Sequence, residues 1–233
     1  PPMNHNDLSS SAVHADLSTA WLGRSYHYVE QIGSTNDRLK AWAADAAHPA
    51  GTVLLADHQT AGRGRLDRRW EAPAGANLLV SLLFRDVPAH PHVLTQRVAL
   101  AARAACEEVA GVAPVLKWPN DLLLGDAKLA GVLAQAHLGA APAVVVGIGV
   151  NVGWAPDGAA MLGAHVEPMV LLAAMLRAYD ALPDDVCLPY REHLGTLGRH
   201  VRVELPDGEV VGRALDVEPD GRLVVIDECG ITH

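Results

Sequence analysis

Short apolar stretches bounded by turn residues predict a series of β-strands in the first two thirds of the chain. Tyr26–Ile32 alternates weakly between polar and apolar positions and ends at Gly33, which predicts a strand. Thr52–Asp57 is a continuous apolar run and predicts a buried strand. The other predicted strands, with a tight reversal at 125–126, are Asn77–Phe84, Val115–Trp118, Leu122–Leu124, Ala127–His137 and Val144–Val152.

Apolar residues at helical spacing predict four helices. Ser34 and Thr35 precede the first, which runs to about Ala47, so this hydroxyl pair lies beside free backbone N–H groups. It can be an ordinary helix cap or a place that holds the polar head of a ligand. The other predicted helices are His92–Val109, Pro168–Leu182 and Asp184–Leu197.

From Arg199 onward the sequence pattern changes to short apolar runs separated by Pro-Asp-Gly turns. This pattern predicts short strands in a small barrel-like β module. A further strand would be expected where the chain stops at His233, so the module can be incomplete. We therefore predict three parts: a disordered polar segment at 1–20, a main domain at 21–197 and the β module at 198–233.

Composition narrows the class of protein. No apolar run approaches the roughly 18 residues that span a bilayer, and the three widely spaced cysteines form neither a disulfide framework nor a zinc motif. With no signal peptide, these features predict a cytoplasmic globular protein that does not associate with membranes. The formal net charge of −9 disfavours nucleic-acid binding.

One cationic stretch stands out on this acidic chain. Asp57–Trp70 carries Arg63, Arg65, Arg68 and Arg69, with Gly62 and Gly64 set one residue apart. Guanidinium groups suit carboxylates and phosphates, and glycines allow the backbone to approach a ligand closely. We therefore expect a small anionic ligand. Phosphate-binding glycine motifs that open a helix are absent from the sequence, so the cations would carry the phosphates.

Five blocks together carry a resemblance to a known family. They are Ser34-Thr35-Asn36, the arginine stretch, Lys117–Asp121, Lys128–Gly131 and Gly147–Asn151. In this order and spacing they resemble the biotin protein ligases, strongly from Val29 to Val152. The resemblance implies an α+β fold: a mixed sheet with helices packed on one side, like the class II aminoacyl-tRNA synthetases, plus a small SH3-like C-terminal domain.

The implied activity has two steps. ATP activates biotin to biotinyl-5′-AMP with release of pyrophosphate, and biotin then passes to a lysine of a biotin carboxyl carrier protein or domain. Lys128 occupies the position of the essential lysine and would bridge the biotin carboxylate and the α-phosphate, although a lysine after a turn is also commonly just a solvated charge. Arg63 would clamp the anions. Asp121 can be a base for the acceptor lysine, or a partner for Mg²⁺ or for Lys117.

The resemblance also implies two sets of binding residues. Ser34, Thr35, Asn36 and Gln59 would hydrogen-bond the ureido ring of biotin. The biotin set also includes Arg63, Gly64, Arg65 and Lys128, with walls from Gly131, Leu133 and Gly147. The ATP set is Arg63, Arg65, Trp70, Lys117, Asn120, Lys128 and Asn151. Trp70 can stack on adenine or pack on the sheet. We expect the arginine loop to be mobile without ligand and to fold over the adenylate.

Two other functions stay open. A lipoate or octanoate ligase would share the fold and act on a similar carrier lysine. A DNA-binding biotin repressor would need an N-terminal domain, for which the residues before Ser34 are too few and too irregular. The sequence leaves a monomer or a weak homodimer possible.

Overall fold

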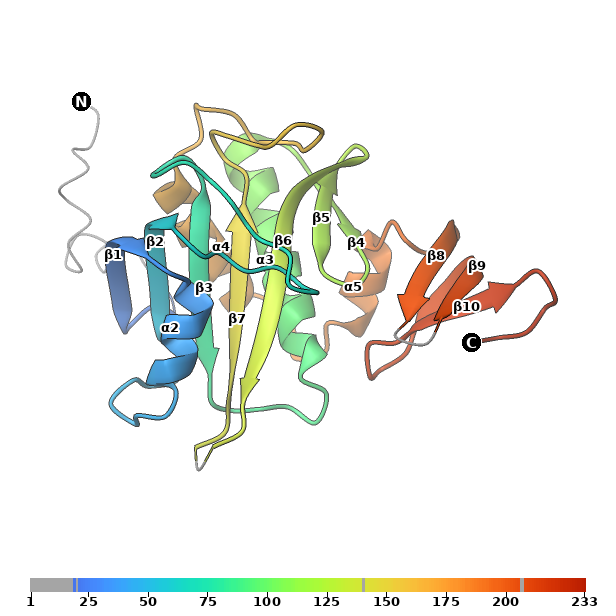
Figure 1. Cartoon of the computed structure of the whole chain (residues 1–233), viewed down its shortest axis with the longest axis horizontal. Helices are drawn as coiled ribbons and strands as arrows, with labels where there is room; N and C mark the ends of the chain where they lie inside the picture. The colour runs from blue at the N-terminus through green and yellow to red at the C-terminus, as the bar shows by residue number, and fades with distance from the viewer. Residues whose placement is uncertain (1–18, 20, 140, 206–207) are drawn as a thin grey trace.

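A seven-stranded mixed sheet forms the centre of the computed structural model, which describes residues 19, 21–139, 141–205 and 208–233 (Figure 1). The strand order is β1-β2-β3-β7-β6-β5-β4; β1 and β2 pair in parallel, and every other neighbouring pair is antiparallel. The strands are β1 (Tyr26–Ile32), β2 (Val53–Gln59), β3 (Leu78–Phe84), β4 (Val115–Lys117), β5 (Asp121–Leu124), β6 (Ala127–His137) and β7 (Ala143–Val150). All seven predicted strands are confirmed.

Helices cover both faces of this sheet. The long helices α3 (His92–Ala110) and α4 (Pro168–Asp180) pack together behind it, and the short helix α2 (Thr35–Trp42) lies in front (Figure 1). Alternate residues of the central strands therefore enter two cores: Leu55 and Leu82 belong to the larger one, and Leu54 and Leu83 pack with α2. The prediction of helices on one side is right for α3 and α4 and wrong for α2. The central strands are buried on both faces, so a helix packs against each face of the sheet.

Two helices are shorter than predicted. Helix α2 ends at Trp42 rather than near Ala47, and the guanidinium of Arg85 donates to backbone carbonyls of the turn that follows, at 43, 45 and 48. Helix α5 spans Cys187–His193 rather than Asp184–Leu197. Hydrophobic spacing continues past these helix ends, so it overestimates their length.

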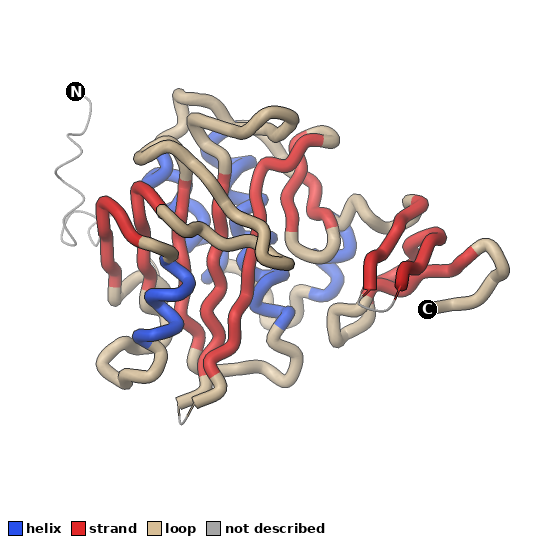
Figure 2. Tube along the Cα trace, in the orientation of Figure 1, coloured by secondary structure: helices blue, strands red, loops and turns tan. Residues whose placement is uncertain are grey.

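The C-terminal residues form a separate antiparallel sheet in the order β10-β9-β8 (Figure 2). Its strands are β8 (His200–Leu205), β9 (Gly208–Val217) and β10 (Leu223–Asp227). It contacts the rest of the chain through the indole N–H of Trp118, just after β4, which donates to the carbonyl of Gly221 at 2.9 Å. It also contacts Arg191 of α5, whose Nε lies 2.7 Å from Oδ1 of Asp216. The proposed domain boundary at 197/198 falls between α5 and β8 and stays a prediction.

Two further sequence predictions concern the N-terminal segment and the membrane. The expected disorder of residues 1–20 falls almost wholly outside the described residues. Across the part of the chain that the structure describes, none of the helices is both long and apolar enough to cross a membrane.

Candidate active site

The α2 face of the sheet carries small residues next to the helix, and this leaves room for a site. Gly147 of β7 is paired with Ser81 of β3 on one side and Leu133 of β6 on the other. Gly149, two residues further along β7, is paired with Gly131 of β6. Residues two apart in a strand share a face. The glycines and Ser81 therefore form one surface of the sheet, beside the N-terminus of α2.

The arginine stretch folds into a hairpin over this surface (Figure 2). The amide of Trp70 donates to the carbonyl of Gly62 at 3.0 Å, and the amide of Gly64 donates to the carbonyl of Arg68 at 2.7 Å. Its tip, Leu66 and Asp67, has φ values of 54° and 57°, a left-handed conformation that costs non-glycine residues about 1 kcal/mol or more each. The hairpin thereby places Arg63 beside the glycines of β6 and β7.

The indole of Trp70 packs on Gly149 and Gly131. A Cβ atom on Gly149 would overlap with the indole, and one on Gly131 would lie 3.3 Å from Cζ3 of Trp70. Of the two predictions made for Trp70, packing against the sheet is the one seen here, and stacking on adenine stays a prediction. The indole N–H is buried and has no hydrogen-bond acceptor among the described residues.

Lys128 faces the same space from the β5–β6 hairpin. Its Nζ lies 2.7 Å from Oδ1 of Asp121 and 5.7 Å from the centroid of the Trp70 ring. Gly125, with φ of 62°, makes the tight turn that sequence analysis predicted between these strands. The ammonium is thus held between a carboxylate and an aromatic face, and 42% of the Lys128 side chain is exposed. Asp121 pairs with Lys128 rather than with Lys117.

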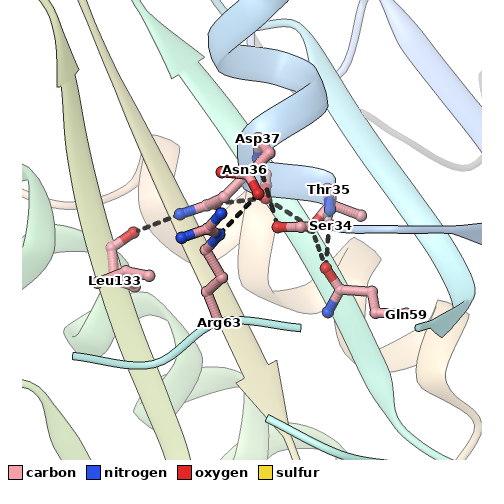
Figure 3. A network of polar contacts seen from close by, with 8 residues as sticks. Ser34, Thr35, Asn36, Asp37, Gln59, Arg63 and Leu133 are labelled. Carbon is pink, nitrogen blue, oxygen red and sulfur yellow. Dashed lines mark hydrogen bonds and ion pairs between the residues drawn. The ribbon is translucent and has the colours of Figure 1, made fainter. Parts of the chain in front are cut away.

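A polar pocket lies where α2 begins (Figure 3). Ser34 caps the helix by accepting the amide of Asp37, and Gln59 Oε1 accepts the amide of Thr35 at 2.7 Å. The side chain of Asn36 reaches across the sheet and donates to the carbonyl of Leu133 at 3.1 Å. Ser34, Thr35 and Asn36 are at most 5% exposed, so three of the predicted ureido-binding residues meet in one buried place.

The structure adds Ser81 to this pocket, a residue that sequence reasoning missed. Its Oγ lies 2.6 Å from Oδ1 of Asn36 and 2.8 Å from Oγ1 of Thr35. The sequence signal was a single hydroxyl residue within the apolar run of β3, although such a residue is not unusual in a strand.

Arg63 and Arg65 point in different directions. Nε of Arg63 donates to Oδ2 of Asp37 at 2.7 Å, which joins the hairpin to the first turn of α2 (Figure 3). Arg65 donates to Asn120 at 3.5 Å, and Asn120 in turn donates to the carbonyl of Val132 at 2.6 Å. Arg63 therefore lies beside the polar pocket, and Arg65 lies near the strand that carries Lys128.

Two cavities collect most of the predicted residues. The small one has a volume of about 30 Å³ and is lined by Ser34, Thr35, Asn36, Gln59, Arg63, Trp70, Gly131, Leu133 and Gly147, among others. The large one, about 660 Å³, opens between the main sheet and β8. Its lining includes Arg63, Gly64, Arg65, Trp70, Lys117, Asn120, Asp121 and Lys128. Both cavities share Arg63 and Trp70, so they lie side by side, and we call the two together the cleft.

Asn151 is the exception. It lines neither cavity, and its amide is 2% exposed and donates to the carbonyls of Lys128 at 3.4 Å and Ala160 at 3.0 Å. Asn77 donates to its Oδ1 at 3.4 Å. The side chain therefore holds the backbone of Lys128 in place, and contact with adenine stays a prediction.

Comparison with known proteins identifies the family. The model of the biotin/lipoate A/B protein ligase family matches residues 28–151, and the biotin protein ligase C-terminal domain matches residues 196–232. The chain belongs to the biotin/lipoate A/B protein ligase family. The resemblance that the five sequence blocks carried is confirmed, and so is the expected C-terminal domain.

Individual relatives of this ligase chain agree. It is 38% identical over 245 residues to the biotin–[acetyl-CoA-carboxylase] ligase of Mycobacterium tuberculosis, covering 96% of this chain and 90% of that protein. It is 30% identical to the bifunctional ligase/repressor BirA of Bacillus subtilis, covering 96% of this chain and 76% of that protein. The biotin protein ligase of Aquifex aeolicus, solved in complex with biotin and ATP, matches with a TM-score of 0.75 and 26% identity over 90% of this chain and 94% of its own.

The donor set of the ligase site bears on the predicted Mg²⁺. No group of three or more histidine, cysteine, aspartate or glutamate residues converges within the described ranges, and Asp121 is a single carboxylate paired with Lys128. Magnesium commonly binds through one or two carboxylates together with substrate phosphates. These residues fit an ion that arrives with ATP and do not form a cage that would hold one by itself.

Proposed function

We propose that the chain ligates biotin to a carrier lysine through an adenylate. A carboxylate oxygen of biotin attacks the α-phosphorus of ATP, the bond to the β-phosphate oxygen breaks, and pyrophosphate leaves. The carrier lysine then attacks the carbonyl carbon of biotinyl-5′-AMP, the bond to the phosphate oxygen breaks, and AMP leaves as the amine loses a proton. The observation that carries this proposal is the cleft in which Lys128 and Arg63 lie beside the polar pocket of Thr35 and Asn36.

The charges in the cleft suit the first step. Two anions must approach each other, and negative charge builds up on the phosphate oxygens as pyrophosphate leaves. Lys128 would lie between the carboxylate and the α-phosphate, and Arg65 and Lys117 in the large cavity would meet the outer phosphates. Mg²⁺ bound to the phosphates would add charge neutralisation. The protein's own contribution is to position the anions and to exclude water.

The small size of the polar pocket supports a moving hairpin. About 30 Å³ is room for two or three water molecules and is too small for a bicyclic ring, so the hairpin of Arg63 and Trp70 would lift to admit one. We propose that the hairpin opens to admit biotin and then covers the adenylate, which protects the mixed anhydride from hydrolysis. The two left-handed residues at its tip are consistent with a segment that changes conformation.

The cellular setting belongs to the same proposal. The acceptor would be a lysine of a biotin carboxyl carrier protein or domain. A cytoplasmic location is supported by the free thiols of Cys106, Cys187 and Cys229. The net charge of −9 argues against a role on DNA, and tight binding to operator-like DNA at physiological salt would contradict us.

One assay tests the reaction and its nearest alternative. The purified protein is incubated with ATP and Mg²⁺ and either biotin or lipoate, and the adenylate is sought by mass spectrometry. We expect biotinyl-5′-AMP, and biotinylation once a carrier domain is added. The pocket of Thr35, Asn36 and Gln59 suits a ureido ring, which lipoate lacks. Formation of a lipoyl adenylate without a biotinyl adenylate would mean that the alternative is correct.

A further inference from the structure

Ser81 lies beneath the polar pocket and is not among the residues that line either cavity. It is fully buried in the middle of β3, opposite Gly147 of β7. Because Gly147 has no side chain, the amide of Asn36 can lie over it, and a Cβ there would overlap with Oδ1 of Asn36. This brings Asn36 within 2.6 Å of the Ser81 hydroxyl.

The available protons decide how this network is arranged. Ser81, Thr35, Asn36 and Gln59 make three contacts through hydroxyl oxygens, of 2.6, 2.8 and 3.1 Å, but the two hydroxyls have only two protons. The donation from Nδ2 of Asn36 to the carbonyl of Leu133 fixes which amide atom faces Ser81, and that atom is the oxygen, which can only accept. Ser81 must therefore donate to Asn36.

The remaining proton belongs to Thr35. Thr35 donates the 2.8 Å hydrogen bond to Ser81, since the Ser81 proton is already used. Gln59 Oε1 is still satisfied by the backbone amide of Thr35 at 2.7 Å. Thr35 Oγ1 then has a free acceptor site and no donor left, so it suits a ligand that carries N–H groups.

We propose that Ser81 is a positioning residue that sets the direction of hydrogen bonding at Thr35 and Asn36 and so favours the N–H-bearing ureido ring of biotin. This inference rests on the proposed function. It also predicts an effect restricted to biotin, since the side-chain hydrogen bonds of Ser81 go to Thr35 and Asn36 in the polar pocket.

Three variants at one position separate the hydrogen bond from packing. Ser81→Ala removes the hydroxyl and leaves Oδ1 of Asn36 without its donor. Ser81→Cys keeps a side chain of similar size but offers only a weak donor. Ser81→Thr keeps the hydroxyl. Thr52→Val is the matched control, because Thr52 is also fully buried and its hydroxyl donates to the carbonyl of Pro49 at 2.7 Å, away from the pocket.

Calorimetric titration with biotin alone, together with KM for biotin and for ATP, tests the proposal. We expect Ser81→Ala and Ser81→Cys to weaken biotin binding about tenfold while KM for ATP stays within about twofold. Ser81→Thr should restore most of the affinity, and Thr52→Val should leave it unchanged. Unchanged biotin affinity in Ser81→Ala would overturn the proposal, and so would an equal rise of both KM values. If the wild-type chain did not bind biotin, the proposed function itself would be wrong.

Discussion

The Nζ atom of Lys128 lies 2.7 Å from Oδ1 of Asp121 across the β5–β6 hairpin, at the mouth of the large cavity. The pair fixes the direction of a side chain that has four rotatable bonds. With the Trp70 ring on its other side, the ammonium is held near the place where the two anionic substrates would meet. An ordered cation of this kind can stabilise charge without reorganising during the reaction.

Replacement of Lys128 tests its role directly. We expect Lys128→Ala to lower the rate of adenylate formation at least about 100-fold, which is the usual effect of removing a group that stabilises developing charge. Since 42% of the side chain is exposed, the free energy of unfolding should change by less than about 1 kcal/mol. Single-turnover formation of biotinyl-5′-AMP and thermal unfolding measure the two quantities. A variant with retained turnover would show that Lys128 is not the central cation.

Asp121→Asn separates an anchor for Lys128 from a base for the carrier lysine. As an anchor, the carboxylate is needed for the first step, so the amide variant should slow adenylate formation as well as transfer. We expect this outcome because the carboxylate is already paired with the lysine. Each half-reaction is measured separately, the second with preformed biotinyl-5′-AMP. Normal adenylate formation with defective transfer would instead identify Asp121 as the base.

The Arg63–Asp37 ion pair has a matched control elsewhere on the surface. Arg177 and Glu108 are also 2.7 Å apart and similarly exposed. Arg63→Gln and Arg177→Gln should both change stability by less than about 1 kcal/mol. Only Arg63→Gln should raise KM for biotin, by about tenfold or more, because that guanidinium also faces the polar pocket. Equal KM values in the two variants would remove Arg63 from the site.

The glycines of β7 should resist substitution for reasons that differ along the strand. In Gly147→Ala the new methyl group would overlap with the Asn36 amide, and in Gly149→Ala it would overlap with the Trp70 indole. We expect the first variant to impair mainly biotin binding and the second to shift the tryptophan fluorescence as the indole moves. Gly33→Ala is the control, since a Cβ there meets nothing within 4 Å. Wild-type fluorescence in Gly149→Ala would contradict the packing described here.

Histidines make stability fall in mildly acidic solution. Burial lowers the pKa of His27, and the nearby His48 lowers it further. The ring of His27 also contacts Ser25 and Trp42. The unfolded chain therefore binds a proton near pH 6.5, at which the folded chain does not yet bind one, so stability is lost as the pH falls through this range. The pKa values of His92 and His193 are also lowered by burial and act in the same direction. Melting temperatures between pH 7.5 and 5 should fall less in His27→Gln than in the wild type.

Local patterns in the sequence were enough to predict the strands and the motif blocks. The run of β3 and the glycines of β7 depend on side-chain character over a few residues, and the spacing of apolar positions reports this directly. The family resemblance used the same local information, because each block is a contiguous segment. The five blocks therefore contain most of the residues that line the cleft.

The relations between blocks came only from the tertiary structure. Ser81 and Asn36 are 45 residues apart, and Arg63 and Asp37 are 26 apart, so their contacts depend on strand order, register and the face that α2 covers. No periodicity in either segment specifies the other segment. The contact of the Asn151 amide with the backbone carbonyl of Lys128, 23 residues away, is of the same kind. Local composition decided which chemistry the chain can carry, and long-range packing decided which atoms face the cleft.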